Sequence, residues 1–178
     1  YLSTYPYECN EQRASRVLAI AALKEVLSEF EAEGLPAPDE LTAGVVADLE
    51  ALKLRQNNDG GFAFWRRGDR SWPYLTIHIA HSLVRAEKMG FKLPDGVLAR
   101  ALQYLVRIER HIPSWYSQRS KDAIIAYSIN VRTQAGDVDK VKALKLAGKG
   151  PDAVSMETLG WILPTLHQSG QTAEVQSI

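Results

Sequence analysis

Apolar residues recur along this chain at the spacing of amphipathic helices. The first run predicts a helix that begins near Asn10 and ends around Gly34, because apolar side chains three and four residues apart share one helix face. Its stripe consists of Leu18, Ala22, Val26 and Phe30, widened by Ala19, Leu23 and Leu27.

The same pattern predicts a second helix up to the turn cluster 56–61 and a third from Trp72-Pro73 to Gly90. Asp39 or Thr42 is expected to cap the second helix and Ser71 the third, since short polar side chains accept hydrogen bonds from first-turn N–H groups. Between these helices, Phe62, Phe64 and Trp65 form an aromatic group that is followed by an exposed polar loop, residues 66–70.

Further helices are predicted from Leu98 to near residues 111–113 and at 118–134, 138–148 and 154–167, and residues 172–178 look like the start of another. Pro164 should end or kink the helix that contains it, because proline lacks the main-chain donor. No stretch alternates in the manner of a strand. The fold class is therefore all-α, built from helix hairpins that repeat at roughly forty-residue spacing.

The composition of the chain excludes several classes of partner and ligand. The chain has 178 residues, 46% of them hydrophobic, and Lys+Arg and Asp+Glu are both 21, so the formal net charge is zero. A partner with a phosphate backbone is not expected, and no apolar run is long enough for a bilayer. One cysteine excludes an intrachain disulfide, and no Cys/His cluster has zinc spacing, so neither metal nor cofactor is expected. The chain opens on Tyr1-Leu2 without an initiator Met and reads as a piece excised from a longer protein.

The candidate chemistry lies at the start of the first helix. Cys9 stands at the predicted helix N-terminus, where main-chain donors and the helix dipole favour a thiolate, the nucleophilic form. Gln12 lies three residues later and therefore faces Cys9 on the first turn. Attack of the sulfur on the Gln12 side-chain carbonyl, with loss of ammonia, would give an internal thioester, a stored acyl donor.

These residues resemble a known family. Tyr5-Pro6-Tyr7-Glu8-Cys9-Asn10-Glu11-Gln12 with Ser15-Arg16 is similar to the thioester motif of bacterial alpha-2-macroglobulins, relatives of the complement thioester proteins. One departure is that Glu8 stands where the family commonly has glycine. The elbow Gln56-x-x-Asp59-Gly60-Gly61-Phe62 and the helix start Tyr74-Leu75-Thr76 extend the resemblance over about the first half of the chain.

The resemblance implies a fold and a function. The fold would be an (α/α) toroid, here an incomplete ring within a single thioester-domain fragment, residues 1–178, with uncovered apolar surface prone to self-association. The function would be covalent capture of an attacking protease by acyl transfer from Gln12 to a lysine amine or hydroxyl, once per molecule rather than as turnover catalysis. Partners would be target proteases and the other macroglobulin domains of a parent chain, with neither nucleic acid nor membrane insertion. The localisation would be periplasmic, cell-envelope or extracellular.

Other candidate residues have alternative roles. Tyr5 and Tyr7 could shield the thioester from water, although Tyr5, Tyr7, Trp65 and Tyr74 are first expected to be core or elbow aromatics. Glu11 either stabilises the helix dipole or supports the thioester pocket. The four histidines are expected to be structural or at the surface. Some complement relatives use a histidine to attack the thioester, and nothing assigns that role to His78, His81, His111 or His167.

Two enzyme classes remain as alternatives. Terpene cyclases of class II and prenyltransferase β subunits share the glycine-aromatic elbow, but the acidic motif of the former and the zinc ligands of the latter are missing. A cysteine hydrolase with Cys9 as nucleophile fits the helix-start position, yet it leaves Gln12 and the elbow unexplained.

Overall fold

The described part of the protein, residues 8–29 and 37–177 of a computed structural model, is all-helical. Within these residues there are eight α-helices, one short 3₁₀ helix and no strand. The predicted all-α class is confirmed, and it is what an (α/α) toroid requires. The chain divides into two compact units, Tyr1–Ala101 and Leu102–Ile178.

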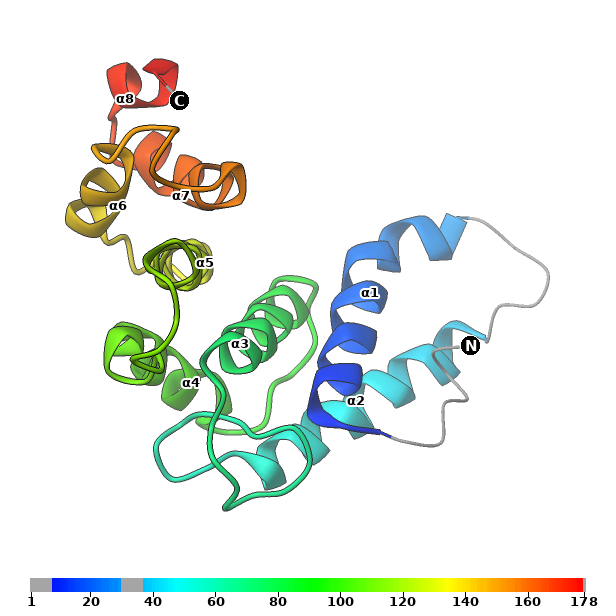
Figure 1. Cartoon of the computed structure of the whole chain (residues 1–178). Helices are drawn as coiled ribbons and strands as arrows, with labels where there is room; N and C mark the ends of the chain where they lie inside the picture. Colours follow the sequence, from blue (N-terminus) through cyan, green and yellow to red (C-terminus); the bar gives the residue numbers. More distant parts are fainter. Residues whose placement is uncertain (1–7, 30–36, 178) are drawn as a thin grey trace. The chain divides into compact units, whose positions relative to one another are not determined.

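The first unit is built on α1 (Asn10–Glu29), α2 (Pro38–Arg55) and α3 (Pro73–Lys88), and α4 (Val97–Val106) begins in it. Helix α1 packs against both α2 and α3 (Figure 1). Helix α1 buries Ala14, Val17 and Ala21 at these contacts. The stripe predicted for this helix is therefore wrong where it is described, because Leu18 and Ala19 are only half-buried and Ala22 is exposed. Burial of one apolar face stabilises each helix. Buried side chains of this core are Ala14, Val17, Ala21, Val45, Leu49, Leu52, Leu75, Ile79 and Leu83.

An elbow, residues 56–72, joins α2 to α3 and is held by buried polar side chains. Gln56 Nε2 donates to the carbonyl oxygens of Gly60 and Val97 at 3.0 and 2.9 Å. Asn57 Nδ2 donates to the Asp69 carbonyl oxygen at 2.8 Å. On α3, Thr76 Oγ1 accepts from the Phe62 N–H at 3.0 Å. These contacts satisfy main-chain groups of a loop that makes no ladder of its own, so the elbow is rigid.

The second unit contains the end of α4, η1 (Ile108–Arg110), α5 (Gln118–Gln134), α6 (Lys140–Ala147), α7 (Met156–Gln168) and α8 (Thr172–Ser177). Helix α7 packs against α5, α6 and α8. Its core consists of Ala126, Ile129, Ala143, Leu146, Val154, Leu159, Ile162 and Leu166. Thr133 and Thr165 join α5 to α7 through a hydroxyl–hydroxyl hydrogen bond of 2.7 Å.

Several predicted boundaries are confirmed and others are wrong. Helix α1 begins at Asn10 and α5 spans Gln118–Gln134, as predicted; the predicted end of the first helix lies outside the described residues. The caps are wrong: Ala37 and Trp72 precede α2 and α3, which begin on Pro38 and Pro73. Proline is pre-organised for the first helical position, so the helices begin at these prolines and the residue before each proline is the N-cap.

Pro164 neither ends α7 nor stands at its last residue, since the helix continues to Gln168. The following turn is closed by the Ser169 N–H, which donates to the Thr165 carbonyl oxygen at 3.0 Å. Ile162, Thr165 and Leu166 are buried on either side of the proline. Packing therefore outweighs the loss of one main-chain donor.

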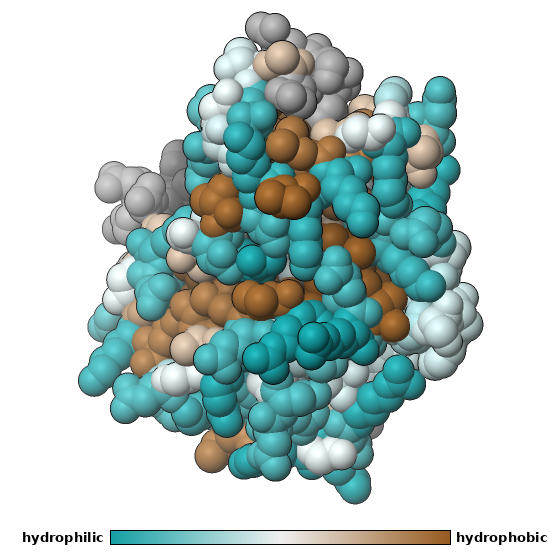
Figure 2. Space-filling model, turned by 90° about the vertical axis from the view of Figure 1, so that its left-hand side faces the viewer, coloured by the Kyte–Doolittle hydropathy of each residue, from teal (hydrophilic) through white to brown (hydrophobic). Residues whose placement is uncertain are grey.

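Some large apolar side chains remain exposed. Figure 2 shows apolar surface interspersed with hydrophilic residues on the face it draws. The most exposed examples in the described residues include Leu54, Trp115, Val141 and Met156, each more than 70% exposed. Self-association through such surface stays a prediction.

Candidate functional site

Cys9 is the N-cap residue of α1. Its carbonyl oxygen accepts the first helical hydrogen bond, from the Arg13 N–H at 3.1 Å, and its side chain is a buried free thiol. The residue itself is 7% exposed. The nucleophile candidate therefore stands at the positive end of the helix dipole, as predicted.

The side chain of Gln12 returns over the first turn to Cys9. Gln12 Oε1 accepts a hydrogen bond from the Cys9 N–H at 3.1 Å. This is the contact that a glutamine at the third helical position makes in a capping box. The structure thus brings the two predicted residues together at the main chain of Cys9 and on the same side of the turn.

Asn10, the residue that follows Cys9, joins the site to the elbow. Its N–H donates to the Phe64 carbonyl oxygen at 2.8 Å and its Nδ2 to the Ala63 carbonyl oxygen at 2.7 Å. Asn10 is fully buried. The sequence analysis did not single it out, because an asparagine after a helix cap gives no signal of a partner more than fifty residues away.

Charged residues surround the segment before the cysteine. Arg13 and Arg16, on α1, both bind Glu8 and also Asp48 of α2, whose side chain is 1% exposed. Arg16 reaches Glu8 at 2.8 Å and Asp48 at 2.6 Å, and Arg13 reaches Asp48 at 2.7 Å. Two guanidinium groups thus balance two carboxylates, and Asp48 is buried only because it is paired.

These pairs shift the protonation of their members. The hydrogen bond from Arg16 lowers the pKa of Glu8 below the ordinary carboxyl range against the effect of partial burial, and the charges of Arg13, Arg16 and Arg55 add to this. The hydrogen bond to Asp48 is the main cause that raises the pKa of Arg16. Glu8 is accordingly a carboxylate at neutral pH, with its charge directed to arginine.

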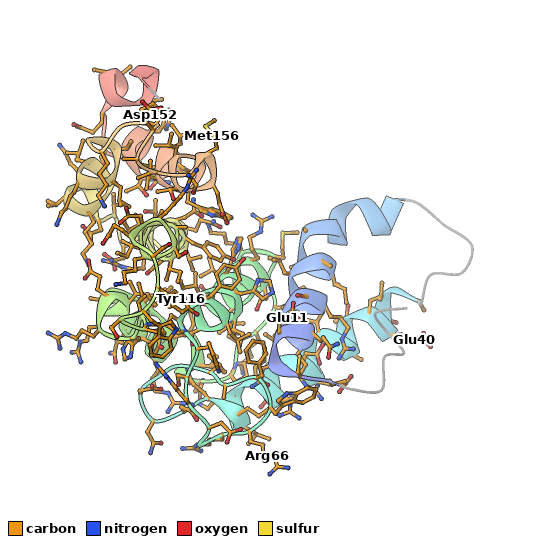
Figure 3. The ribbon with its side chains drawn as sticks, viewed as in Figure 1. Glu11, Glu40, Arg66, Tyr116, Asp152 and Met156 are labelled. Atoms are coloured by element: carbon orange, nitrogen blue, oxygen red, sulfur yellow. The ribbon has the colours of Figure 1, made fainter. Side chains whose placement is uncertain are left out.

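Glu11 belongs to a second polar group, between α1 and α3. Ser15 Oγ donates to Glu11 Oε1 at 2.8 Å and lies 2.9 Å from His78 Nε2. Figure 3 shows Glu11 on the side of α1 that faces α3. Because Ser15 gives its one proton to Glu11, the hydrogen between Ser15 and His78 belongs to Nε2. His78 is then a donor to Ser15, and the pair is not the nucleophile and base of a serine hydrolase.

Both histidines on α3 are held neutral. Burial lowers the pKa of His78, and the charge of Glu11 only partly opposes it. Burial also lowers the pKa of His81, to about 4, helped by His78, Arg85 and Lys88. The sequence predicted structural histidines but not the contact with Ser15, which depends on how α1 and α3 pack.

The aromatic predictions have mixed outcomes. Tyr5 and Tyr7 lie outside the described residues. Trp65 and Tyr74 are 54% and 56% exposed, so of the two predicted places, core or elbow, the core is excluded for both. Trp65 lies in the elbow, whereas Tyr74 is on the first turn of α3. Within the elbow, Phe64 meets Trp72 edge to face at a centroid distance of 6.0 Å. The buried aromatic of the elbow is Phe62.

The described residues contain neither a cluster of metal ligands nor a membrane-spanning helix. No three His, Cys, Asp or Glu side chains in that part of the chain are placed to share a metal ion. None of its helices combines the length and the apolar character that crossing a membrane demands.

The other two histidines lie in the second unit. His111 stacks on Tyr104 at a ring-centroid distance of 3.8 Å, and His167 is exposed on α7.

No family model matches the chain, but several known proteins are similar to it, and they are of one kind. It is 30% identical over 149 residues to the alpha-2-macroglobulin of Escherichia coli K12, and this covers 82% of the chain and 8% of the relative. The alpha-2-macroglobulin of Rickettsia conorii is 28% identical over 138 residues, which are 75% of the chain and 7% of that protein. The chain thus spans less than a tenth of the length of these curated relatives.

Solved structures show the same fold. Native E. coli alpha-2-macroglobulin, from domain MG7 to the C-terminus, matches with a TM-score of 0.80 at 23% identity, over 98% of this chain and 28% of that one. Salmonella alpha-2-macroglobulin reacted with methylamine matches with a TM-score of 0.79 at 23% identity, over 98% of this chain and 12% of that one. Trypsin-activated E. coli alpha-2-macroglobulin matches with a TM-score of 0.77 at 24% identity, over 97% of this chain and 12% of that one.

Proposed function

The chain is a homologue of one segment of the bacterial alpha-2-macroglobulins, and on that premise we propose that residues 1–178 are a fragment of their thioester-containing domain. The sequence motif around Cys9 and the fold shared with the E. coli protein both support this assignment. The parent protein would be a protease inhibitor, located in the periplasm, in the cell envelope or outside the cell.

The proposed reaction joins Cys9 to Gln12. Sγ attacks the Gln12 side-chain carbonyl carbon, the carbon–nitrogen bond breaks, and ammonia leaves with the thiol proton. The resulting thioester is later opened by a nucleophile of the captured protease. A lysine amine gives an amide and a hydroxyl gives an ester, and in either case Cys9 is released as the thiol. Each molecule reacts once, so it is a covalent trap and not a turnover enzyme.

The observation that carries the proposal is the hydrogen bond from the Cys9 N–H to Gln12 Oε1. It holds the reacting carbonyl beside the residue that supplies the sulfur, which lowers the entropic cost of ring closure. A capping box uses the same contact without chemistry. In this proposal Glu11, which accepts a hydrogen bond from Ser15, supports the first turn. The role of shielding the bond from water is assigned to Tyr5 and Tyr7, which lie outside the described residues.

The partners in this proposal are proteases and further domains of a longer chain. Trypsin and porcine elastase activate the E. coli relative, which supports proteases as targets here. Reaction of the Salmonella relative with methylamine supports an electrophilic group that accepts amines. Shielding by a neighbouring domain would keep water from the bond.

Intact-mass measurement with thiol labelling tests the proposal. In the parent protein, Cys9 should resist labelling until methylamine is added, and methylamine should then be found on Gln12. A Cys9→Ser variant should incorporate none. A thiol that labels before treatment, together with an unmodified Gln12 side chain, would contradict the proposal.

The 178-residue chain alone should have a free Cys9 thiol, because the shielding domain is not part of it and water hydrolyses an unshielded thioester. An unlabelled Cys9 with a mass lower by one ammonia would contradict this expectation while supporting the chemistry.

A further inference from the structure

The guanidinium of Arg55 contacts the residues on both sides of Cys9. Its Nη1 donates to the Glu8 carbonyl oxygen at 3.0 Å and to Asn10 Oδ1 at 3.3 Å. Arg55 is the last residue of α2, so the end of that helix is tied to the start of α1. Both acceptors belong to chain neighbours of Cys9. One charged group therefore restrains the main chain before the cysteine and the side chain of the residue after it.

Glu8 adds a second restraint on the same segment. Its carboxylate binds Arg13 and Arg16, and these arginines are themselves held by buried Asp48. The main chain of Glu8 is therefore fixed by Arg55 and its side chain by α1. Asn10, on the other side of Cys9, is fixed by the elbow carbonyls.

The restrained group that matters chemically is the Cys9 N–H. It donates to Gln12 Oε1, and when a nucleophile attacks the Gln12 carbonyl carbon an electron pair moves onto that oxygen. A main-chain donor already in place at such an oxygen stabilises the developing charge and accelerates acyl transfer. The pair returns to carbon when ammonia leaves during ring closure, or when sulfur leaves during capture.

We propose that Arg55 and Glu8 are positioning residues, which anchor the main chain around Cys9 so that its N–H stays directed at Gln12 Oε1 as an oxyanion donor. The Glu8 carboxylate, paired with two arginines, is a side-chain anchor next to the cysteine. The effect on acyl transfer rests on the proposed function, whereas the anchoring itself does not.

Hydrogen exchange of the Cys9 and Asn10 amides tests the anchoring in the 178-residue chain. Arg55→Met should accelerate exchange at both by about tenfold, the loss expected for a charge-assisted hydrogen bond. Arg55→Lys should lie between Arg55→Met and the unmodified chain, because lysine keeps the charge but not the two-point contact. Glu8→Gln should accelerate exchange by a smaller factor. Exposed Arg66→Met and Glu40→Gln, on residues labelled in Figure 3, are the matched controls and should change nothing.

The pH profile separates anchoring from a general loss of stability. Glu8 faces Arg13, Arg16 and Arg55, with Asp48 behind the first two, and its pKa is lowered. Protection of the Asn10 amide, relative to an exposed amide at each pH, should therefore fall only below the ordinary carboxyl range. Glu8→Gln should abolish that fall. If amide exchange is unchanged in Arg55→Met, Arg55→Lys and Glu8→Gln, the proposed anchoring is overturned. If Arg55→Met unfolds, exchange in Arg55→Lys and in Glu8→Gln decides whether the anchoring exists.

The rate of methylamine-induced thiol release in the parent protein tests the chemical half. Arg55→Met and Glu8→Gln should lower that rate by about tenfold with the controls unaffected, since a loosened donor loses part of the hundredfold or more that an oxyanion donor contributes. Equal rates would overturn the role in acyl transfer. If the unmodified protein has no thioester at all, the proposed function fails, and the exchange data still decide whether the anchor exists.

Discussion

Gln12 meets two needs at the start of α1. Its side-chain oxygen satisfies the Cys9 N–H, which would otherwise lack a partner at a helix end, and the same contact places an acyl carbon near a nucleophile. The spacing Cys-x-x-Gln was enough to predict that the two residues face each other. It could not predict that Asn10, Arg55 and Glu8 hold the main chain between them, because those contacts come from other segments.

His81 makes the stability of the first unit depend on pH. Its pKa is about 4 in the folded protein, below the ordinary value of 6.5, so its contribution to stability is full above pH 6.5 and is lost as the pH falls toward 4. Between pH 7 and pH 5, the unmodified chain should lose on the order of 1–2 kcal/mol more than His81→Gln, a value discounted for partial exposure.

Urea unfolding at pH 7 and pH 5 measures this difference in the free energy of unfolding. Amide exchange in α3 at the same two pH values is the second measurement. The matched control is His167→Gln, since His167 is an exposed histidine of the other unit. Equal pH dependence in the unmodified chain and in His81→Gln would show that burial does not keep this side chain neutral.

At the scale of elements, the elbow between α2 and α3 positions the site. It supplies the two carbonyl oxygens that hold Asn10, and its own shape depends on Gln56, Asn57 and Thr76. Gly60 permits the turn, with φ of 87°, and a Cβ there would lie 2.3 Å from the Arg100 carbonyl oxygen. Both the conformation and the space therefore require glycine.

Gly60→Ala should destabilise the first unit by about 2–4 kcal/mol, because it adds a main-chain clash to the cost of a positive φ. Gly68→Ala is the matched control: φ is 97° there, but no atom lies within 4 Å of an added Cβ, so about 1 kcal/mol is expected. Denaturant unfolding measures both changes. Equal costs would mean that Arg100 yields and that only the dihedral angle matters.

At the scale of the whole molecule, the described chain consists of two compact units, each with its own buried core. All residues of the candidate site belong to the first unit. The second unit has a separate apolar core between α5, α6 and α7, with a buried threonine pair. We propose that residues 1–178 are one fragment of a thioester domain. The two cores do not bear on that proposal, since they show only how each unit is stabilised.

Ile162→Ala should test whether the units unfold separately. Ile162 is fully buried in the second core, so the truncation should cost about 2–5 kcal/mol there. We expect faster amide exchange in α5 and α7, with exchange in α1 and α3 unchanged, as for independent cooperative units. A uniform acceleration across the chain would indicate one cooperative unit. The exposed Val141→Ala, on α6, is the control.

The sequence by itself determined the helical class, most helix positions and the pairing of Cys9 with Gln12, because periodicity and the i, i+3 relation are local properties of one helix. Only the tertiary structure decided the rest: that Trp65 and Tyr74 are exposed, that Ser15 meets His78, and that Arg55 contacts both chain neighbours of the cysteine. Each of these depends on contacts between segments far apart in the chain, whose energies no local pattern contains.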